Sequence, residues 1–173
     1  MTRQEQEIAT IKERTLKLKL SDADCERISK KAGKHGLTVA ELLENFIGDL
    51  TGGSHSNGSD ERDYADQWFE RCWFGMYPEN TLLHHLLSWG YEPEEYINAL
   101  DSLVCAILDK KNAEEHPEEY DEWSLSDIEE EIEELQEEIE ELQEEWEPEN
   151  EPNMDEEIAT IKKWLKEMEE LKG

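Results

Sequence analysis

Lysine and arginine are missing from residues 113–157, a stretch that contains 24 acidic residues. Over the whole chain, 47 acidic residues outnumber 17 basic ones, and the formal net charge is −30. A surface of this sign repels the phosphates of nucleic acids and membranes and attracts basic surfaces. The composition therefore favours a basic partner, although acidic surfaces also serve solubility.

Cysteine is scarce as well. Cys25, Cys72 and Cys105 are far apart and form no CxxC pair, which is typical of a reducing compartment. No apolar run approaches the length that spans a membrane, and the first residues lack the apolar core of a signal peptide. We expect a soluble, cytoplasmic protein that does not contact membranes.

Catalytic and metal-binding motifs are also absent. The sequence has no Gly-rich phosphate loop, no GxSxG, no HExxH and no Asp-rich calcium loop. His84 and His85 are adjacent, so on a helix their side chains diverge by about 100° and cannot chelate one ion together. We expect no enzyme activity, no cofactor and no metal site.

Charge and composition vary along the chain and divide it into segments. Residues 1–50 have equal numbers of acids and bases, and residues 51–59 are rich in Gly and Ser, as in flexible linkers. Most aromatic residues lie in 60–112, where three helices are expected. The acidic residues 113–125 would then link this domain to two C-terminal helices within 126–173. The fold class that we predict is mainly α with one short strand.

That strand is predicted at Thr15–Leu20, where leucine alternates with polar residues. A helix should follow from Ser21 or Asp22 and end near Gly33–Gly36. A second helix should start after Thr38, because Glu41 three residues later completes a capping box.

This order of strand, helix, turn and helix over residues 15–50 resembles the ribbon-helix-helix family of the Arc and methionine repressors. The resemblance implies that two chains pair their strands into a homodimer and insert the ribbon into the major groove of DNA. It places Leu16, Leu18 and Leu20 in the dimer core and assigns four residues to DNA: Thr15, Lys17 and Lys19 to bases and Thr38 to a phosphate. Dimerisation without DNA binding remains the alternative.

The aromatic segment 60–112 predicts one helix over residues 60–77, a second that Asn80 caps and a third that opens at Pro93. In the third helix, an apolar set recurs at helical spacing: Ile97, Leu100, Val104, Ile107 and Leu108. We expect this set to form a small core with the aromatic side chains. An exposed aromatic groove is the alternative.

The acidic helix starts at a capping box, Ser126 to Glu129, and carries apolar residues at alternating spacings of four and three: Ile128, Ile132, Leu135, Ile139, Leu142 and Trp146. This is the seam of a coiled coil. The seam predicts either an intermolecular coiled coil or a hairpin with the lysine-bearing last helix. We favour the hairpin because it brings opposite charges together.

A stiff acidic helix carries charge at a density comparable to that of DNA. In this respect the chain looks like the acidic DNA mimics and anti-CRISPR inhibitors of phages and mobile elements. The resemblance implies a non-enzymatic inhibitor of a basic nucleic-acid-binding protein in the host cytoplasm, such as a type II CRISPR effector nuclease, that blocks target-DNA binding or a later step. The expected contacts are Glu129, Glu130, Glu133, Glu134, Glu137, Glu140, Glu141 and Glu144.

The alternative function is a ribbon-helix-helix transcriptional regulator or antitoxin. It would bind DNA through its N-terminal strand and a basic partner, such as a toxin, through its acidic tail. The two functions make opposite demands on the chain. The regulator needs Lys17 and Lys19, whereas the inhibitor needs the acidic helix.

Overall fold

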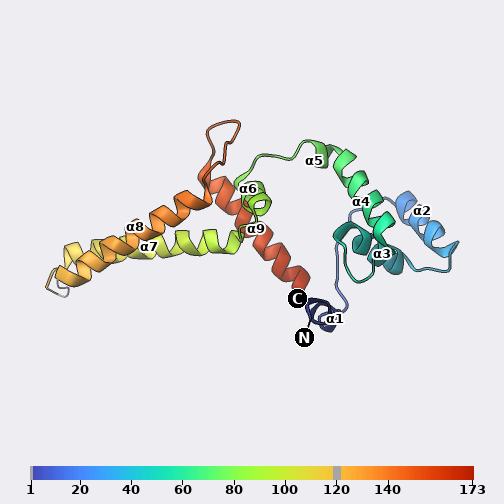
Figure 1. Cartoon of the computed structure of the whole chain (residues 1–173), viewed down its shortest axis with the longest axis horizontal. Coiled ribbons are helices and arrows are strands. Elements are labelled where there is room, and N and C mark those ends of the chain that lie inside the picture. Colours follow the sequence, from blue (N-terminus) through green and yellow to red (C-terminus); the bar gives the residue numbers. More distant parts are fainter. Residues whose placement is uncertain (1, 119–121) are drawn as a thin grey trace. The chain divides into compact units, whose positions relative to one another are not determined.

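The computed structural model describes residues 2–118 and 122–173, and every regular element within these ranges is a helix (Figure 1). The expected mainly α class is therefore confirmed. The chain divides into two compact units, Met1–Pro78 and Glu79–Gly173. The division lies inside the segment 60–112, which the sequence analysis treated as one three-helix domain.

The predicted N-terminal strand is wrong. Residues 15–20 form no regular element, and Leu16, Leu18 and Leu20 are all exposed. A strand needs a neighbour that takes its backbone N–H and C=O groups, and residues 2–118 and 122–173 contain no strand that could do so. Alternation of leucine with polar residues is therefore insufficient here, and the structure contains no ribbon of the ribbon-helix-helix type.

The first unit consists of α1 (Arg3–Ala9), α2 (Asp22–Gly33), α3 (Val39–Thr51), α4 (Ser59–Arg71) and the short α5 (Trp73–Met76). Within it α2 packs on α3, α3 on α4 and α4 on α5. Two expected caps are confirmed: the Ser21 hydroxyl accepts the Asp24 N–H, and Thr38 and Glu41 form the capping box. The cap predicted at Asn80 is wrong, because Thr81 caps the helix Leu82–Trp89.

The Gly/Ser-rich segment 51–59 turns back onto α3. Gly52 ends this helix in the left-handed conformation at φ 66°, which glycine adopts without strain. A Cβ atom at Gly48 would lie 2.6 Å from the carbonyl carbon of His55, so the close approach requires glycine. The Asp49 carboxylate accepts hydrogen bonds from the backbone N–H and the side-chain amide of Asn57, at 2.6 and 2.9 Å. These contacts hold the segment inside the first unit.

The helix expected over residues 60–77 is interrupted at Cys72, where the backbone is extended at φ −70° and ψ 151°. The interruption separates α4 from α5 and lets aromatic rings meet edge to face. Trp68 lies 5.4 Å from Phe46 and 6.2 Å from Phe74 between ring centroids. Even so, the rings of Trp68, Phe74 and Trp73 stay exposed, so in this unit the aromatic residues form a surface rather than a closed core.

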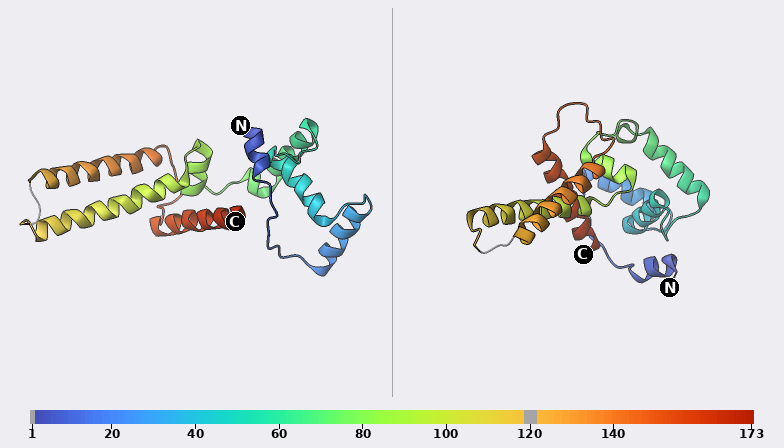
Figure 2. Two further views of the ribbon diagram at one scale, coloured as in Figure 1. Left: turned by 90° about the horizontal axis from the view of Figure 1, so that it is seen from below. Right: turned by 60° about the vertical axis from the view of Figure 1, so that its left-hand side comes forward.

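The second unit consists of α6 (Leu82–Trp89), α7 (Pro93–Glu115), α8 (Glu122–Leu142) and α9 (Met154–Lys172). Helices α7 and α8 lie side by side along their length in Figures 1 and 2. Two contacts show that they are antiparallel. Tyr96 near the start of α7 is hydrogen-bonded to Gln143, just after the end of α8. Lys110 near the end of α7 forms an ion pair with Glu129, in the first half of α8.

The predicted acidic linker 113–125 is mostly helical in its described part. Helix α7 continues to Glu115, and α8 already begins at Glu122 rather than at the predicted capping box. Residues 119–121 of this linker lie outside the described residues.

The acidic helix does form a hairpin, but its partner is α7 rather than the last helix, which we favoured. Helix α8 packs along α7, and the last helix, α9, packs on α6 and α7 instead. The residues of α7 that face α8 recur at spacings of three and four, and every second one is an alanine: Tyr96, Ala99, Leu103, Ala106, Lys110 and Ala113. Alanines bring two helix backbones close together, so the larger Ile and Leu side chains of α8 find room between them.

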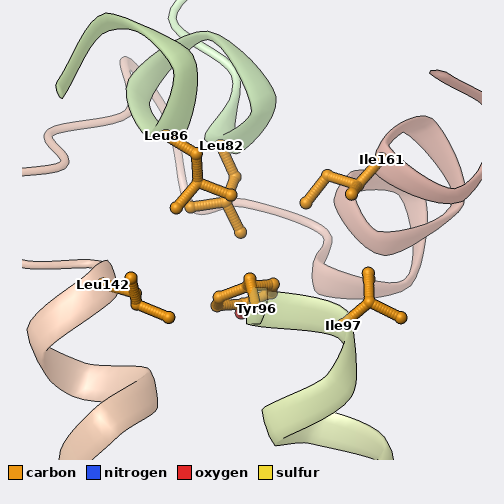
Figure 3. Packing of buried hydrophobic residues seen from close by; sticks show 6 residues of the cluster. All are labelled: Leu82, Leu86, Tyr96, Ile97, Leu142 and Ile161. Atoms are coloured by element: carbon orange, nitrogen blue, oxygen red, sulfur yellow. The ribbon is translucent and has the colours of Figure 1, made fainter. Parts of the chain in front are cut away.

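One hydrophobic cluster joins all four helices of the second unit (Figure 3). Its members come from α6, α7, α8 and α9: Leu82, Leu86, Tyr96, Ile97, Leu142 and Ile161. Hydrogen bonds surround the cluster. The Glu157 carboxylate of α9 accepts the Leu82 N–H at the start of α6, at 2.8 Å. The indole N–H of Trp146 donates to the Asn80 carbonyl at 3.3 Å. The cluster thus fixes one end of the α7–α8 hairpin.

Candidate functional site

Helix α8 has one covered face and one acidic face. Its seam residues Ile128, Ile132, Leu135 and Ile139 are half-buried, and Leu142 is buried. The predicted contact residues are all exposed; seven of them lie on α8 and Glu144 lies in the turn that follows it: Glu129, Glu130, Glu133, Glu134, Glu137, Glu140, Glu141 and Glu144. The structure therefore brings these glutamates together on the solvent side of the hairpin, which we call the acidic face.

The acidic face is held in place at both ends of the hairpin. Near the core, the Gln143 amide donates to the Tyr96 hydroxyl. Toward the other end, the Lys110 ammonium lies 2.8 Å from the Glu129 carboxylate. The hydrogen bond with Glu129, together with the negative charge of that carboxylate, raises the pKa of Lys110. Glu129 is thereby partly neutralised, so the net charge of the acidic face rests mainly on its other glutamates.

The spacing of the carboxylates can be compared with that of DNA phosphates. The eight glutamates of the acidic face lie between Glu129 and Glu144. At the helical rise of about 1.5 Å per residue, this amounts to roughly one carboxylate per 3 Å of helix axis. One DNA strand carries a charge about every 3.4 Å and the duplex about every 1.7 Å. The acidic face falls between these two spacings.

The other side of the hairpin contains a shallow groove of about 390 Å³. Asp101, Cys105, Asp109 and Glu131 line it, together with neighbouring small residues. Among the residues that the structure describes, no group of three or more His, Cys, Asp or Glu side chains has the arrangement that could hold a metal ion.

The structure does not bring the predicted DNA contacts into one element. Thr15, Lys17 and Lys19 lie exposed in the irregular segment before α2, whereas Thr38 caps α3. The Glu41 carboxylate accepts hydrogen bonds from the Thr38 N–H at 2.7 Å and from its hydroxyl at 2.8 Å. These bonds, the backbone one first, lower the pKa of Glu41. A carboxylate thus occupies the hydrogen-bonding position that the resemblance assigned to a phosphate.

The sequence analysis missed one surface feature. Val104, Ile107 and Leu108 of α7, which it assigned to a core, are exposed. The helical spacing of these three residues is present, as predicted. Helix α8 packs on a different face of α7, however, where Ala99, Ala106 and Ala113 allow the two backbones to come close. The signal that could have revealed this is the regular spacing of those alanines, which matches the spacing of the seam on α8.

Within the described parts of the chain, no helix combines the length and the apolar composition needed to cross a membrane. Comparisons of the chain with protein-family models, with curated proteins and with solved structures found no match.

Proposed function

We propose that the protein is a non-enzymatic inhibitor that binds the basic nucleic-acid-binding surface of another protein through the acidic face of α8. A CRISPR effector nuclease is the target class that we propose, with type II nucleases first. These enzymes hold the guide–target duplex in a positively charged channel, which would accept a helix with closely spaced carboxylates.

The observation that supports this proposal is the separation of the two faces of α8. The apolar seam lies against α7, and the acidic glutamates lie in solvent on the same helix. A partner therefore meets the carboxylates on a helix that is already folded. Binding then requires less ordering of the chain than binding by a disordered acidic tail would require.

The charge pattern also indicates how binding should respond to salt. Exposed charges are screened over about 8 Å at physiological ionic strength, so binding through the acidic face should weaken as salt is added. An inhibitor of this kind acts stoichiometrically, because it occupies the DNA site and transforms no substrate.

Fluorescence anisotropy of a labelled DNA duplex tests the proposal. The protein is titrated first into the duplex and then into a guide-loaded type II nuclease that binds the same duplex. We expect no binding of the duplex by the protein itself, and release of the duplex from the nuclease. Replacing Glu130, Glu134, Glu137 and Glu141 by Gln should weaken this release by at least about tenfold, since it removes four exposed charges.

The matched control replaces four other exposed glutamates by Gln: Glu149, Glu151, Glu167 and Glu169. It changes the net charge of the chain equally but leaves the acidic face intact, so release of the duplex should stay close to that by the wild type. Equal inhibition by the wild type and the acidic-face variant would refute the proposal. Binding of the duplex by the protein itself would refute it as well.

A further inference from the structure

Helix α7 carries an apolar face that is covered over only half of its length. In the C-terminal half, Val104, Ile107 and Leu108 are 56%, 47% and 53% exposed. Ile107 and Leu108 lie three and four residues after Val104, so the three side chains form one stripe along the helix. We call these three residues the open stripe.

The covered half of the same face shows what kind of element packs on it. Ile97 belongs to the core cluster together with Ile161 of α9 (Figure 3). Leu100 packs against that cluster. Next to these contacts, the Lys162 ammonium of α9 lies 3.5 Å from the Asp101 carboxylate. The covered half is therefore packed against an amphipathic helix, α9. The apolar residues of α9 contact α7, and its Lys162 pairs with the Asp101 carboxylate of α7.

Charged side chains of α7 and α8 lie beside the open stripe. Ile107 lies one helical turn before Lys110, and Lys110 reaches Glu129 on α8. Glu133 lies one turn further along α8 on the same side as Glu129, near enough for its charge to add to the effect of Glu129 on the pKa of Lys110. The edge of α8 beside the open stripe thus carries two carboxylates, of which Glu129 already pairs with Lys110.

This combination selects among the possible occupants. The phosphates of a DNA or RNA strand would be repelled by Glu129 and Glu133. A second copy of the hairpin would place like charges opposite one another along its length. An amphipathic helix with basic flanks can pack on the open stripe and pair with Glu133, and it would complete a three-helix arrangement in which α7 contacts helices on all its apolar positions.

We propose that the open stripe and the neighbouring edge of α8 form the docking site for a basic amphipathic helix of the target protein. This inference rests on the proposed function, because it specifies which element of the basic partner the hairpin receives. The site binds with apolar contacts on α7 and with an ion pair to Glu133, because Glu129 already pairs with Lys110. The apolar contacts determine which basic segment is selected, and the ion pair brings it to the hairpin.

The probe is a fluorescein-labelled synthetic peptide of about 18 residues, or five helical turns, with Leu at helical spacing and Lys elsewhere. A second peptide has the same composition in an order that removes the helical spacing of Leu. Anisotropy titrations with the full-length protein should show tighter binding of the patterned peptide. Equal affinity for the two peptides would overturn the proposal, because attraction by net charge alone would then account for the binding.

Variants locate the site. Val104→Ser and Leu108→Ser should each weaken binding of the patterned peptide by about tenfold, through loss of apolar contact area. Leu18→Ser is the matched control, since Leu18 is also exposed but lies in the first unit. Circular dichroism should show unchanged helix content, because all three side chains are exposed in the folded protein. Peptide affinity that does not change with Val104→Ser or Leu108→Ser overturns the proposal.

Light scattering separates this occupant from a second copy of the chain. We expect Leu108→Ser to leave the molar mass in solution unchanged. A wild-type dimer that becomes a monomer on this substitution would assign the open stripe to the dimer and overturn the proposal.

The nuclease assay keeps the two proposals apart. If the patterned peptide is not preferred while the acidic-face variant still loses inhibition, the docking site fails and the inhibitor function stands. If the peptide is preferred and the open-stripe variants lose it while the nuclease is unaffected, the docking site stands and the proposed target class fails.

Discussion

The side-chain amide of Gln143 donates a hydrogen bond to the hydroxyl of Tyr96, and the two atoms lie 2.5 Å apart. Tyr96 is completely buried in α7, and Gln143 immediately follows α8. Burial is the main reason that the pKa of Tyr96 is raised, with a smaller opposing effect of the Gln143 hydrogen bond. The bond therefore attaches the end of the acidic helix to the core by a neutral buried hydroxyl.

Removing one partner of this hydrogen bond should lower the free energy of unfolding more than removing both partners. We predict that Gln143→Leu lowers the free energy of unfolding by about 1–3 kcal/mol, because it leaves a buried hydroxyl unsatisfied. The double variant Gln143→Leu with Tyr96→Phe should recover most of this loss. Urea unfolding of the two single variants and the double variant measures the coupling. Additive losses would contradict the prediction.

His85 should be replaceable by an apolar residue at a gain in stability. It is buried in α6, and its Nε2 atom has no hydrogen-bond partner among the described residues. A buried polar atom without a partner costs about 1–3 kcal/mol, so His85→Leu should raise the free energy of unfolding by up to this amount. The exposed neighbour His84 provides the control, because His84→Leu should change the melting temperature little. A lower melting temperature for His85→Leu would show that its ring has a favourable contact.

The small residues of α7 should be essential for the hairpin. Ala106 is buried in the α7 face toward α8, where a larger side chain would separate the helices. We predict that Ala106→Leu destabilises the second unit by about 1–3 kcal/mol through overpacking. Asn112→Leu adds a leucine on an exposed position of the same helix and should have a much smaller effect. Thermal unfolding followed by circular dichroism compares the two variants.

The stability that the segment after α3 gives to the first unit should decrease at acid pH. Hydrogen bonds from Asn57, first from its side chain and then from its backbone, lower the pKa of Asp49 in the folded state. A carboxyl group with a lowered pKa contributes stability above its unfolded value of about 3.9, and this contribution is lost as the pH falls through the folded value. Asp49→Asn should therefore be less stable than the wild type at neutral pH.

The difference between Asp49→Asn and the wild type should shrink as the pH falls below about 4. Urea unfolding followed by tryptophan fluorescence, from neutral pH down to that range, measures it. A difference that persists at the lowest pH would show that ionisation of Asp49 is not the cause, and would leave the loss of one accepting oxygen as the reason.

Charge reversal in the N-terminal segment should spare inhibition. Lys17 and Lys19 lie in the exposed irregular segment of the first unit, whereas the acidic face belongs to the second unit. We predict that Lys17→Glu with Lys19→Glu leaves release of the duplex from the nuclease unchanged. The anisotropy assay described above provides the measurement. Loss of inhibition on this change would mean that the inhibitory contact includes the first unit.

Local features of the fold could be predicted from the sequence because their causes lie within a few residues. The caps at Ser21 and Thr38 form between residues three apart, and the structure has both. The apolar seam of the acidic helix follows from a periodicity along one helix, and this seam is indeed its covered face. The exposure of the glutamates opposite the seam follows from the same periodicity.

What the sequence did not decide is which surfaces meet. The pattern at residues 15–20 fits a strand, but a strand exists only if another strand completes its hydrogen bonds, and the described fold provides none. The seam of α8 would fit several partners. Helix α7 covers it because Ala99, Ala106 and Ala113 allow close approach, and this choice leaves Val104, Ile107 and Leu108 in solvent. Helical periodicity is local and was determined by the sequence alone, whereas pairing depends on the shapes of surfaces distant in the chain, which only the tertiary structure decided.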